Sequence, residues 1–537
     1  MGQLNRTVAL SGLIVLAAVI VLLRLHTYDE PLERDLTTYA VVAHEMIGGK
    51  ALYSDLWDHK PPAIHVTYAA AELIAGYGRD SIFLLNIAAA IATMIGCYFA
   101  GRTIGGAVGG LSTAAFWALA AGDLALEGNQ PNTELFLNTF LSAGFAVCVC
   151  APREGLGWRR SVAAGVLFAV ASLYKQVIIA HVALLALVYF ATTRRGSRKR
   201  AIVDLATIGT MAVTAWALVF GYFALRGHGE AFIDAVFKYN RWYAAAAVDP
   251  TKHIFGWPPV FADVLAVILP LATLSFAGLL VGLTAGPRRP WLLLLAFAAA
   301  THVAVLLPGH FYPHYYQLWL PPLVIGAGWS VGLLKRVLVA RLSWLSYVTA
   351  AVTCMVLVLM AVPYYRLSPQ IWSFRKYGMI FIETERLAVK LDRLFPRNIT
   401  LFEWGNETGL YFETQRKPPS GVVYAYPVQA GPLALKLSGR VLAELKDKLP
   451  DVVVTAKPVW VFTAGHPITK WLRENYRPVW QTENFMVRVR KGSAADGLCT
   501  VQRTNRPLNP TPCSMPTLDD VQRRLLKFVD PRSASAR

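Results

Sequence analysis

Long apolar segments recur along the first two thirds of the chain at a length that suits membrane-spanning helices. A helix needs about 20 apolar residues to cross the hydrocarbon core of a bilayer. One apolar segment, 63–76, is too short and is predicted to form a helix at or partly in the interface. Eleven others approach the required length: residues 8–25, 81–100, 104–121, 133–150, 161–174, 177–192, 203–224, 260–284, 290–307, 316–334 and 345–363. The pattern predicts an α-helical polytopic membrane protein with about eleven transmembrane helices.

The composition agrees with this interpretation and excludes other classes of protein. The 537 residues are 55% hydrophobic and 16% charged, whereas soluble domains average about 45–50% apolar and about 25% charged. A disordered chain is excluded, and a water-soluble enzyme is not expected. Lys and Arg number 52 against 33 Asp and Glu, a net charge of +19. Part of this charge lies in short loops between spans, where cytoplasmic loops collect cations, so no nucleic-acid partner is needed to explain it.

The apolar stretch 161–192 has two readings, because only Lys175 and Gln176 interrupt it. It could be one tilted helix or two short spans with a turn at the lysine. Basic residues flank both ends, at 159–160 and at 194–200, so both ends are expected in the cytoplasm. That requires an even number of crossings. The stretch is therefore predicted to form two spans with Lys175 at the outer turn.

This topology places residues 26–80, 122–132, 225–259 and 308–315 outside, together with everything after about 365. The last part of the chain changes character and is predicted to be a soluble α/β domain. Its expected helices are 372–395 and 433–449, and its expected strands are 399–404, 421–426, 451–456 and 484–490. The predicted domains are a membrane domain at 1–365, the α/β domain at 366–490 and a Pro-rich basic tail at 491–537. Cys499 and Cys513 either form a disulfide there or remain free thiols.

Polar residues of the first outer loop are candidates for chemistry. Apolar positions between Asp35 and Ile47 recur at helical spacing and predict an amphipathic helix on the outer membrane surface. Asp35 would lie in its first turn, where a carboxylate is common in any helix. Lys60 precedes Pro61 and Pro62, which fix the backbone. A cation presented rigidly at headgroup depth suits a phosphate, although a lysine that snorkels to the interface gives the same pattern.

Further charged and aromatic groups belong to other outer segments. Glu134 and Lys175 lie at span level, where a charge costs about 2.5–3.5 kcal/mol on insertion scales and usually faces a cavity. Their structural alternatives are a helix cap for Glu134 and an ion pair for Lys175. Two histidines, His310 and His314, lie in an outer loop that is otherwise typical of an aromatic belt. The common outer face of these groups and the first loop suits transfer from a lipid phosphate, with a carboxylate as proton acceptor and fixed cations at the phosphate.

The order of these motifs resembles a known family. Asp35-x-x-x-Tyr39-Ala, Asp58-His-Lys-Pro-Pro, Asn132-Thr-Glu, Lys175 and Pro313-His-Tyr-Tyr-Gln-Leu-Trp-Leu-Pro-Pro are similar to the bacterial branch of the protein O-mannosyltransferase and lipid A aminoarabinose transferase family. These are GT-C glycosyltransferases, and the resemblance covers roughly residues 27–335. It implies a polyprenyl-phosphate sugar donor and transfer on the outer face of the membrane.

The resemblance also implies roles for individual residues. Asp35 matches the catalytic aspartate. Glu134 matches the second acidic residue and is expected to orient the acceptor or an ion. Lys60 and Lys175 match the lysines that bind the donor phosphate. We expect His314 and Tyr315 to assist these lysines.

The chain departs from the family pattern at two positions. Leu36 stands where the family usually has Glu, and His59 where it often has Glu or Asp. Some members bind a metal there, so a divalent metal held by His59 or Asp58 remains an alternative to a metal-free site. The acidic pair at 29–30 lacks the Tyr-Ala that follows Asp35, which favours Asp35 as the catalytic acid.

These observations predict an extracytoplasmic glycosyltransferase of the bacterial inner membrane. The acceptor would be a lipid, a glycan or a protein, and membrane lipids would surround the spans. A transporter or flippase of lipid-linked sugars is the main alternative, but its charges are expected along a path through the membrane. A non-catalytic anchor for the outer domain would leave the charges at span level without a purpose.

Overall fold

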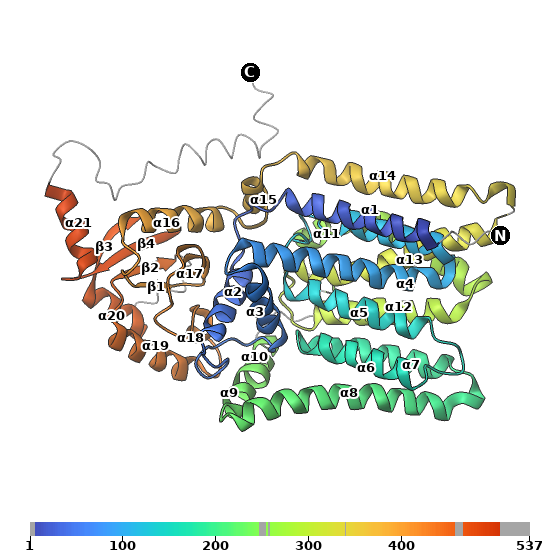
Figure 1. Cartoon of the computed structure of the whole chain (residues 1–537), viewed down its shortest axis with the longest axis horizontal. Coiled ribbons are helices and arrows are strands. Elements are labelled where there is room, and N and C mark those ends of the chain that lie inside the picture. The colour runs from blue at the N-terminus through green and yellow to red at the C-terminus, as the bar shows by residue number, and fades with distance from the viewer. Residues whose placement is uncertain (1–5, 246–253, 256–257, 339, 457–464, 505–537) are drawn as a thin grey trace, which may run out of the picture. The chain divides into compact units, whose positions relative to one another are not determined.

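The computed structural model describes residues 6–245, 254–255, 258–338, 340–456 and 465–504. The chain divides into two compact units, whose elements are labelled in Figure 1. The first unit consists of residues 1–29 and 59–368, and the second of residues 30–58 and 369–537. The first outer loop therefore belongs partly to each unit, with the division after Asp58.

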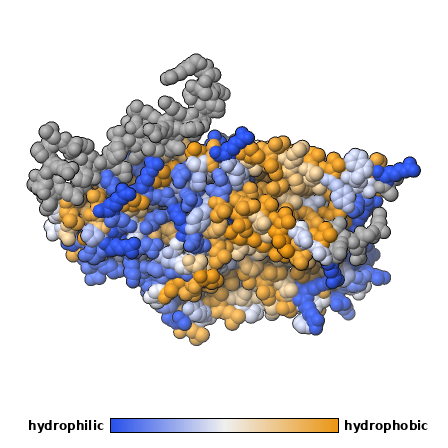
Figure 2. Space-filling model, turned by 45° about the horizontal axis from the view of Figure 1, so that its top comes forward, coloured by the Kyte–Doolittle hydropathy of each residue, from blue (hydrophilic) through white to orange (hydrophobic). Residues whose placement is uncertain are grey.

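Apolar helices make up most of the first unit, and every predicted span is helical. Seven helices in the described residues are long and apolar enough to cross a membrane, and Figure 2 shows the broad apolar surface that they present. The prediction of a polytopic membrane protein is confirmed. The predicted spans correspond to α1 (Arg6–Leu25), α4 (Arg79–Ala120), α5 (Thr133–Val149), α6 (Trp158–Ser172), α7 (Ile179–Thr192), α8 (Arg198–Leu225), α11 (Pro258–Ala285), α12 (Arg288–Leu306), α13 (Leu320–Val337) and α14 (Leu345–Tyr365).

Helix α4 contains two of the predicted spans because the chain folds back at Gly106. Gly106 has a φ of 59° and a ψ of −144°, which no helix allows. The indole N–H of Trp117 donates to the carbonyl of Ala90 at 2.9 Å, although in a straight helix these residues would lie about 40 Å apart. A Cβ at Gly105 would lie 2.8 Å from the Cα of Gly332. Small residues therefore allow α4 and α13 to pack closely, as in many membrane helix pairs.

The stretch around Lys175 forms two helices, as the flanking charges predicted. Helix α6 ends at Ser172, Lys175 is extended (φ −158°, ψ 127°), and the 3₁₀ turn η1 (Gln176–Ile178) leads into α7. The far ends of the two helices meet again, because the N–H of Arg194 donates to the carbonyl of Arg153 at 3.1 Å. The basic residues before α6 and after α7 therefore lie at the same end of the pair.

Shorter helices connect the spans of the first unit. Helix α3 (Ala63–Ala75) confirms the predicted short helix after Pro61 and Pro62. The remaining connecting elements in the described residues are η2 (Arg195–Ser197), α9 (Gly229–Ile233), the π-helix η3 (Asp234–Tyr239), α10 (Asn240–Ala245), η4 (Pro313–Trp319) and η5 (Ala340–Leu342).

A mixed four-stranded sheet forms the centre of the second unit. Its strands are β1 (Leu401–Trp404), β2 (Val452–Ala456), β3 (Tyr476–Gln481) and β4 (Phe485–Arg490), in the order β1-β2-β4-β3. Strands β1 and β2 are parallel, with Leu401 opposite Val452, and the other pairs are antiparallel. All residues of β2 are buried, as expected of a central strand covered on both faces.

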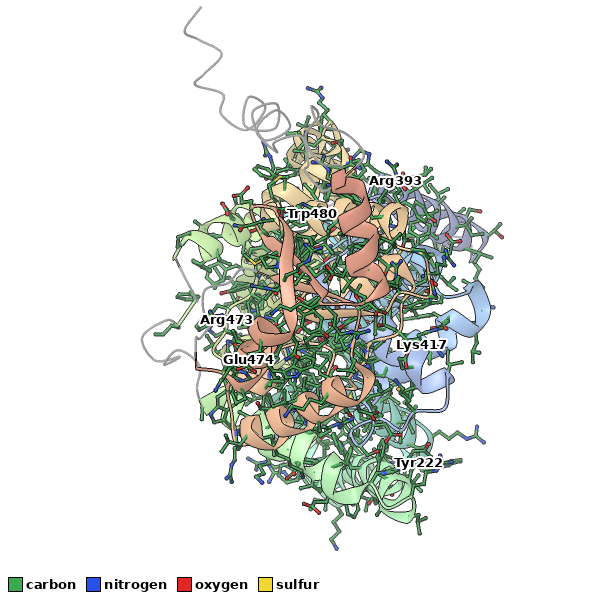
Figure 3. All side chains as sticks on the ribbon, turned by 90° about the vertical axis from the view of Figure 1, so that its left-hand side faces the viewer. Tyr222, Arg393, Lys417, Arg473, Glu474 and Trp480 are labelled. Carbon is green, nitrogen blue, oxygen red and sulfur yellow. The ribbon has the colours of Figure 1, made fainter. Side chains whose placement is uncertain are left out.

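Helices surround this sheet, and the figures place several of them. They are α2 (Arg34–Ile47), α15 (Pro369–Tyr377), α16 (Ile380–Leu394), α17 (Gly409–Thr414), α18 (Tyr426–Gln429), α19 (Ala434–Lys448), α20 (Pro467–Asn475) and α21 (Ala494–Thr504). Figure 3 shows Arg473 and Glu474 on α20 and Trp480 on β3. The ammonium of Lys390 in α16 covers the Trp480 ring at 3.8 Å.

Three features of this domain differ from the prediction. The expected helix 372–395 is divided at Gly378, which has a φ of 70°, into α15 and α16. Residues 421–426 were expected to be a strand, but they form a loop that leads into α18. Val422 and Val423 are 3% and 1% exposed. Their burial in the core gave this loop the apolar run that was taken for a strand. Strand β3 was missed because Pro478 argues against a strand. It is tolerated there because β3 is an edge strand with a bulge between Pro478 and Trp480.

Helix α2 confirms the predicted helix, but it is packed rather than lying exposed on a surface. The hydroxyls of Thr37 and Thr38 lie 2.8 and 2.9 Å from the hydroxyl of Thr408, just before α17. Arg34 forms an ion pair with Glu407 at 3.1 Å. The amphipathic pattern of α2 therefore reflects packing in the second unit. The tail begins with α21, which includes Cys499, whereas Cys513 lies outside the described residues.

Candidate active site

A buried ion pair joins two of the predicted site residues. Glu134 lies in the first turn of α5 and is 1% exposed. Its Oε1 is 2.5 Å from Nζ of Lys175, and its Oε2 accepts a hydrogen bond from Thr133 at 2.8 Å. The helix break between α6 and η1 places the lysine there. Nζ of Lys175 also lies 3.7 Å from the ring centroid of Tyr315, a cation–π contact.

A second pair joins His314 to a carboxylate that the sequence analysis missed. Nδ1 of His314 is 2.9 Å from Oε2 of Glu127, and both side chains are largely buried. His314 and Tyr315 belong to η4, whose first residue is Pro313. The signal for Glu127 was weak, since it is one acid in a polar loop rich in Gly, Asn and Pro, with no motif around it.

Lys60 lies close to these groups because the segment that follows it is hydrogen-bonded to the turn at Lys175. The N–H of Ala63, at the start of α3, donates to the carbonyl of Leu173 at 3.1 Å, which ties the segment after Lys60 to the turn that contains Lys175. Lys60 and His314 both lie within electrostatic reach of Glu134. The structure therefore brings Lys60, Glu134, Lys175, His314 and Tyr315 together within the first unit.

Aromatic rings and two further histidines border this cluster. The ring of His310 stacks on Tyr243 with centroids 4.1 Å apart, and the ring of His59 lies 5.3 Å from Tyr243. Burial lowers the pKa of His310, and the positive charges of Lys175, Lys60 and His59 lower it further. These effects favour the neutral imidazole of His310, which can both donate and accept a hydrogen bond.

Asp35 and Asp58 belong to the second unit. Asp35 is half-buried in the first turn of α2, and the hydroxyl of Tyr39 donates to its Oδ2 at 3.4 Å. Asp58 is 2% exposed and accepts a hydrogen bond from the hydroxyl of Tyr424 at 3.1 Å. The expected convergence of Asp35 with Lys60 stays a prediction.

The residues expected at a metal site do not gather into one. Among the residues that the structure describes, no group of three His, Cys, Asp or Glu side chains could hold a metal ion. Asp58 faces Tyr424, whereas His59 lies against the rings of Tyr239 and Tyr243. A divalent metal held by His59 or Asp58 stays a prediction, and no step of the proposed mechanism uses one.

The bundle of apolar helices and the mixed sheet define a multi-pass membrane protein with an attached α/β domain. Its structure resembles that of ArnT from Cupriavidus metallidurans bound to undecaprenyl phosphate, with a TM-score of 0.60 and 16% identity over 91% of this chain and 99% of that chain. The apo state of ArnT gives a TM-score of 0.58 at 16% identity, over 89% of this chain and 98% of that chain. The chain therefore shares its fold with ArnT, as its motifs led us to expect.

A more distant likeness is to AglB, an oligosaccharyltransferase from Archaeoglobus fulgidus, in complex with an inhibitory peptide and a dolichol-phosphate. Its TM-score is 0.46 at 14% identity, over 83% of this chain and 69% of that chain. Comparison of the sequence with family models and with curated proteins finds no match.

Proposed function

We propose that this protein is a glycosyltransferase that moves a sugar from a polyprenyl-phosphate donor to an acceptor hydroxyl. We assign the reaction to the extracytoplasmic face of the bacterial inner membrane. The observation that carries the proposal is the cluster of Lys60 and Lys175 around the buried Glu134 in a bundle of apolar helices. The likeness to ArnT with bound undecaprenyl phosphate supports the class of donor.

The cations of this cluster bind the phosphate in the proposed reaction. Lys175 lies in a turn that is only partly exposed, so its ammonium is poorly screened by water. Lys60 adds a second positive charge. As the bond between the sugar and the phosphate oxygen breaks, the departing phosphate gains a negative charge, which these fixed cations stabilise.

Asp35 is the general base of this proposal. It accepts the proton of the acceptor hydroxyl while the hydroxyl oxygen attacks the anomeric carbon of the sugar. The polyprenyl monophosphate then leaves, and the proton remains on Asp35 until solvent removes it. General-base catalysis of this kind contributes about 10²–10⁴-fold to the rate.

We propose a role for Glu134 other than the expected orientation of the acceptor or an ion. Its two oxygens contact Lys175 and Thr133. We assign Glu134 to the positioning of Lys175. The second unit is assigned to acceptor selection, because the Asp35 helix belongs to it and packs through Arg34 and Thr37 against Glu407 and Thr408, which precede α17.

Transfer by the purified protein tests the assignment of the base. The protein is incubated with polyprenyl-phosphate sugars and envelope acceptors, and the products are identified by mass spectrometry. The variant Asp35→Asn is expected to lose transfer by about 10²-fold or more. The matched control, Asp29→Asn, removes an exposed acid of the first unit and should transfer normally. Normal transfer by Asp35→Asn, or loss only in Asp29→Asn, would disprove the assignment.

A further inference from the structure

Glu127 is a buried carboxylate whose position the backbone maintains at some cost. It is 5% exposed and has a φ of 50°, in the left-handed region that non-glycine residues rarely adopt. Such a conformation is unfavourable for any residue that has a Cβ. The side chain of Gln317 holds it in place by donating to the carbonyls of Leu126 and Glu127 at 3.1 and 3.2 Å. Strain that is maintained in this way is typical of functional sites.

The partner of Glu127 is a side chain of the candidate active site. Oε2 of Glu127 lies 2.9 Å from Nδ1 of His314. Gln317 lies in the same 3₁₀ helix, η4, as His314, so the loop and η4 are joined twice, once through side chains and once through the backbone carbonyls. A carboxylate on one ring nitrogen fixes the orientation of an imidazole and leaves the other nitrogen for a ligand. Nδ1 of His314 is therefore engaged by Glu127, and a ligand of the ring would approach Nε2.

The charges around His314 indicate the kind of ligand that its ring would contact. Lys175 contacts the ring of Tyr315, and that ring lies edge-on to His314 with centroids 4.9 Å apart. Glu134, which pairs with Lys175, feels the charges of both His314 and Lys60. A negatively charged ligand that contacts both lysines would therefore come within reach of His314.

We propose that Glu127 is a positioning residue that holds His314 as a third cation for the phosphate group, acting mainly on the polyprenyl monophosphate that leaves. This inference rests on the proposed function and adds a residue to it. The donor is a phosphodiester with one negative charge, whereas the released monoester carries about −1.5 to −2 at pH 7. A protonated His314 balances the charge that appears when the bond to the sugar breaks. The proton on His314 comes from solvent, and no further reactant is needed.

Binding of polyprenyl monophosphate to the full-length protein in nanodiscs tests the proposal without requiring transfer. Glu127→Gln retains an acceptor for Nδ1–H but removes the charge. We expect it to weaken binding about 10-fold or more at pH 8, the order of effect that carboxylate partners of metal-bound histidines contribute. The loss should be smaller at pH 6, because an imidazole without the carboxylate is protonated more often at the lower pH. Asp123→Asn is the matched control, because it removes a buried carboxylate from the same loop and should bind normally.

A second variant separates positioning from folding. His314→Gln should weaken monophosphate binding similarly at both pH values, and Glu127→Gln should add nothing in the double variant, because both changes remove the same cation. Thermal unfolding of each variant identifies any that fail to fold. The proposal is overturned if Glu127→Gln binds like the wild type at both pH values, if its loss is the same at pH 6 and pH 8, or if the two losses add.

The same experiment separates this inference from the proposed function. If the wild type binds polyprenyl monophosphate with the expected pH dependence but transfers no sugar, the role of Glu127 stands and the transferase proposal fails. If transfer occurs and Glu127→Gln transfers and binds normally, the transferase proposal stands and the role of Glu127 fails.

Discussion

The ion pair between Lys175 and Glu134 allows a decisive test, because it could serve either structure or phosphate binding. Lys175→Met keeps an apolar chain beside Tyr315 but leaves Glu134 buried without its closest partner. Removal of one member of a buried pair costs about 3–5 kcal/mol. We expect the lower end of that range, because Thr133 still donates to Glu134 and the charges of Lys60 and His314 remain within reach.

The double variant Lys175→Met with Glu134→Leu removes both charges. Replacement of a buried pair by apolar residues is often neutral or stabilising, so stability should return to within about 1 kcal/mol of the wild type. Transfer should remain absent, because the phosphate has lost Lys175. The control Lys238→Met breaks an exposed pair with Asp234 at 3.3 Å and should cost at most about 1 kcal/mol.

Thermal unfolding in detergent and sugar transfer are measured on the same preparations. Recovery of transfer in the double variant would show that Lys175 serves only to neutralise Glu134, and its assignment to the phosphate would then be withdrawn. An unchanged melting temperature for Lys175→Met would mean that the pair is not buried as described.

Two further predictions concern carboxyl groups away from the candidate site. Burial raises the pKa of Asp123 from 3.8 to about 6, so the folded state binds the proton more tightly and stability falls as the pH rises from about 4 to about 6. The free energy of unfolding of Asp123→Asn should therefore exceed that of the wild type by about 3 kcal/mol above pH 6, with no gain at pH 4. A gain that does not depend on pH would contradict this explanation. Glu403 is 2% exposed, and neither carboxyl oxygen makes a hydrogen bond of normal geometry to a described residue. Burial and the charge of Glu407 raise the pKa of Glu403 well above the usual range. Glu403→Gln should therefore be more stable than the wild type by about 1–3 kcal/mol at pH 8, with a higher melting temperature, and the gain should be smaller at pH 5. A lower melting temperature at pH 8 would indicate a partner that glutamine cannot replace.

The fold of the first unit could be predicted because the bilayer imposes simple rules. Apolar length located the spans, and the charges on both sides of 161–192 identified the turn at Lys175. The hairpin at Gly106 followed from two spans in close succession. Glu127 could not be predicted, because its importance depends on a contact with His314, 187 positions away, that no local pattern records.

The second unit was less predictable for the same reason. The burial of α2 and the pairing of Thr37 with Thr408 join segments 371 positions apart. A helix with one apolar face has the same sequence pattern whether that face meets lipid or another part of the protein. The sequence therefore predicted α2 but not its surroundings. Strand β3 was missed because Pro478 is compatible with a strand only at an edge, which local sequence does not reveal.

The charged groups of the candidate site share one structural property, which explains why some were found and one was not. Each lies where regular helix is interrupted. Two prolines follow Lys60, and Lys175 is itself an extended residue between two helices. Glu134 lies in the first turn of α5, His314 lies in a 3₁₀ helix, and Glu127 is itself left-handed. Interruptions of this kind keep polar groups out of the apolar helix faces, where a charge is expensive. A proline, or a lone lysine in an apolar stretch, can be recognised in a sequence. The left-handed backbone of Glu127 cannot, because glutamate occurs in every kind of local structure. A site residue that is placed only by its backbone conformation is therefore found only in the structure.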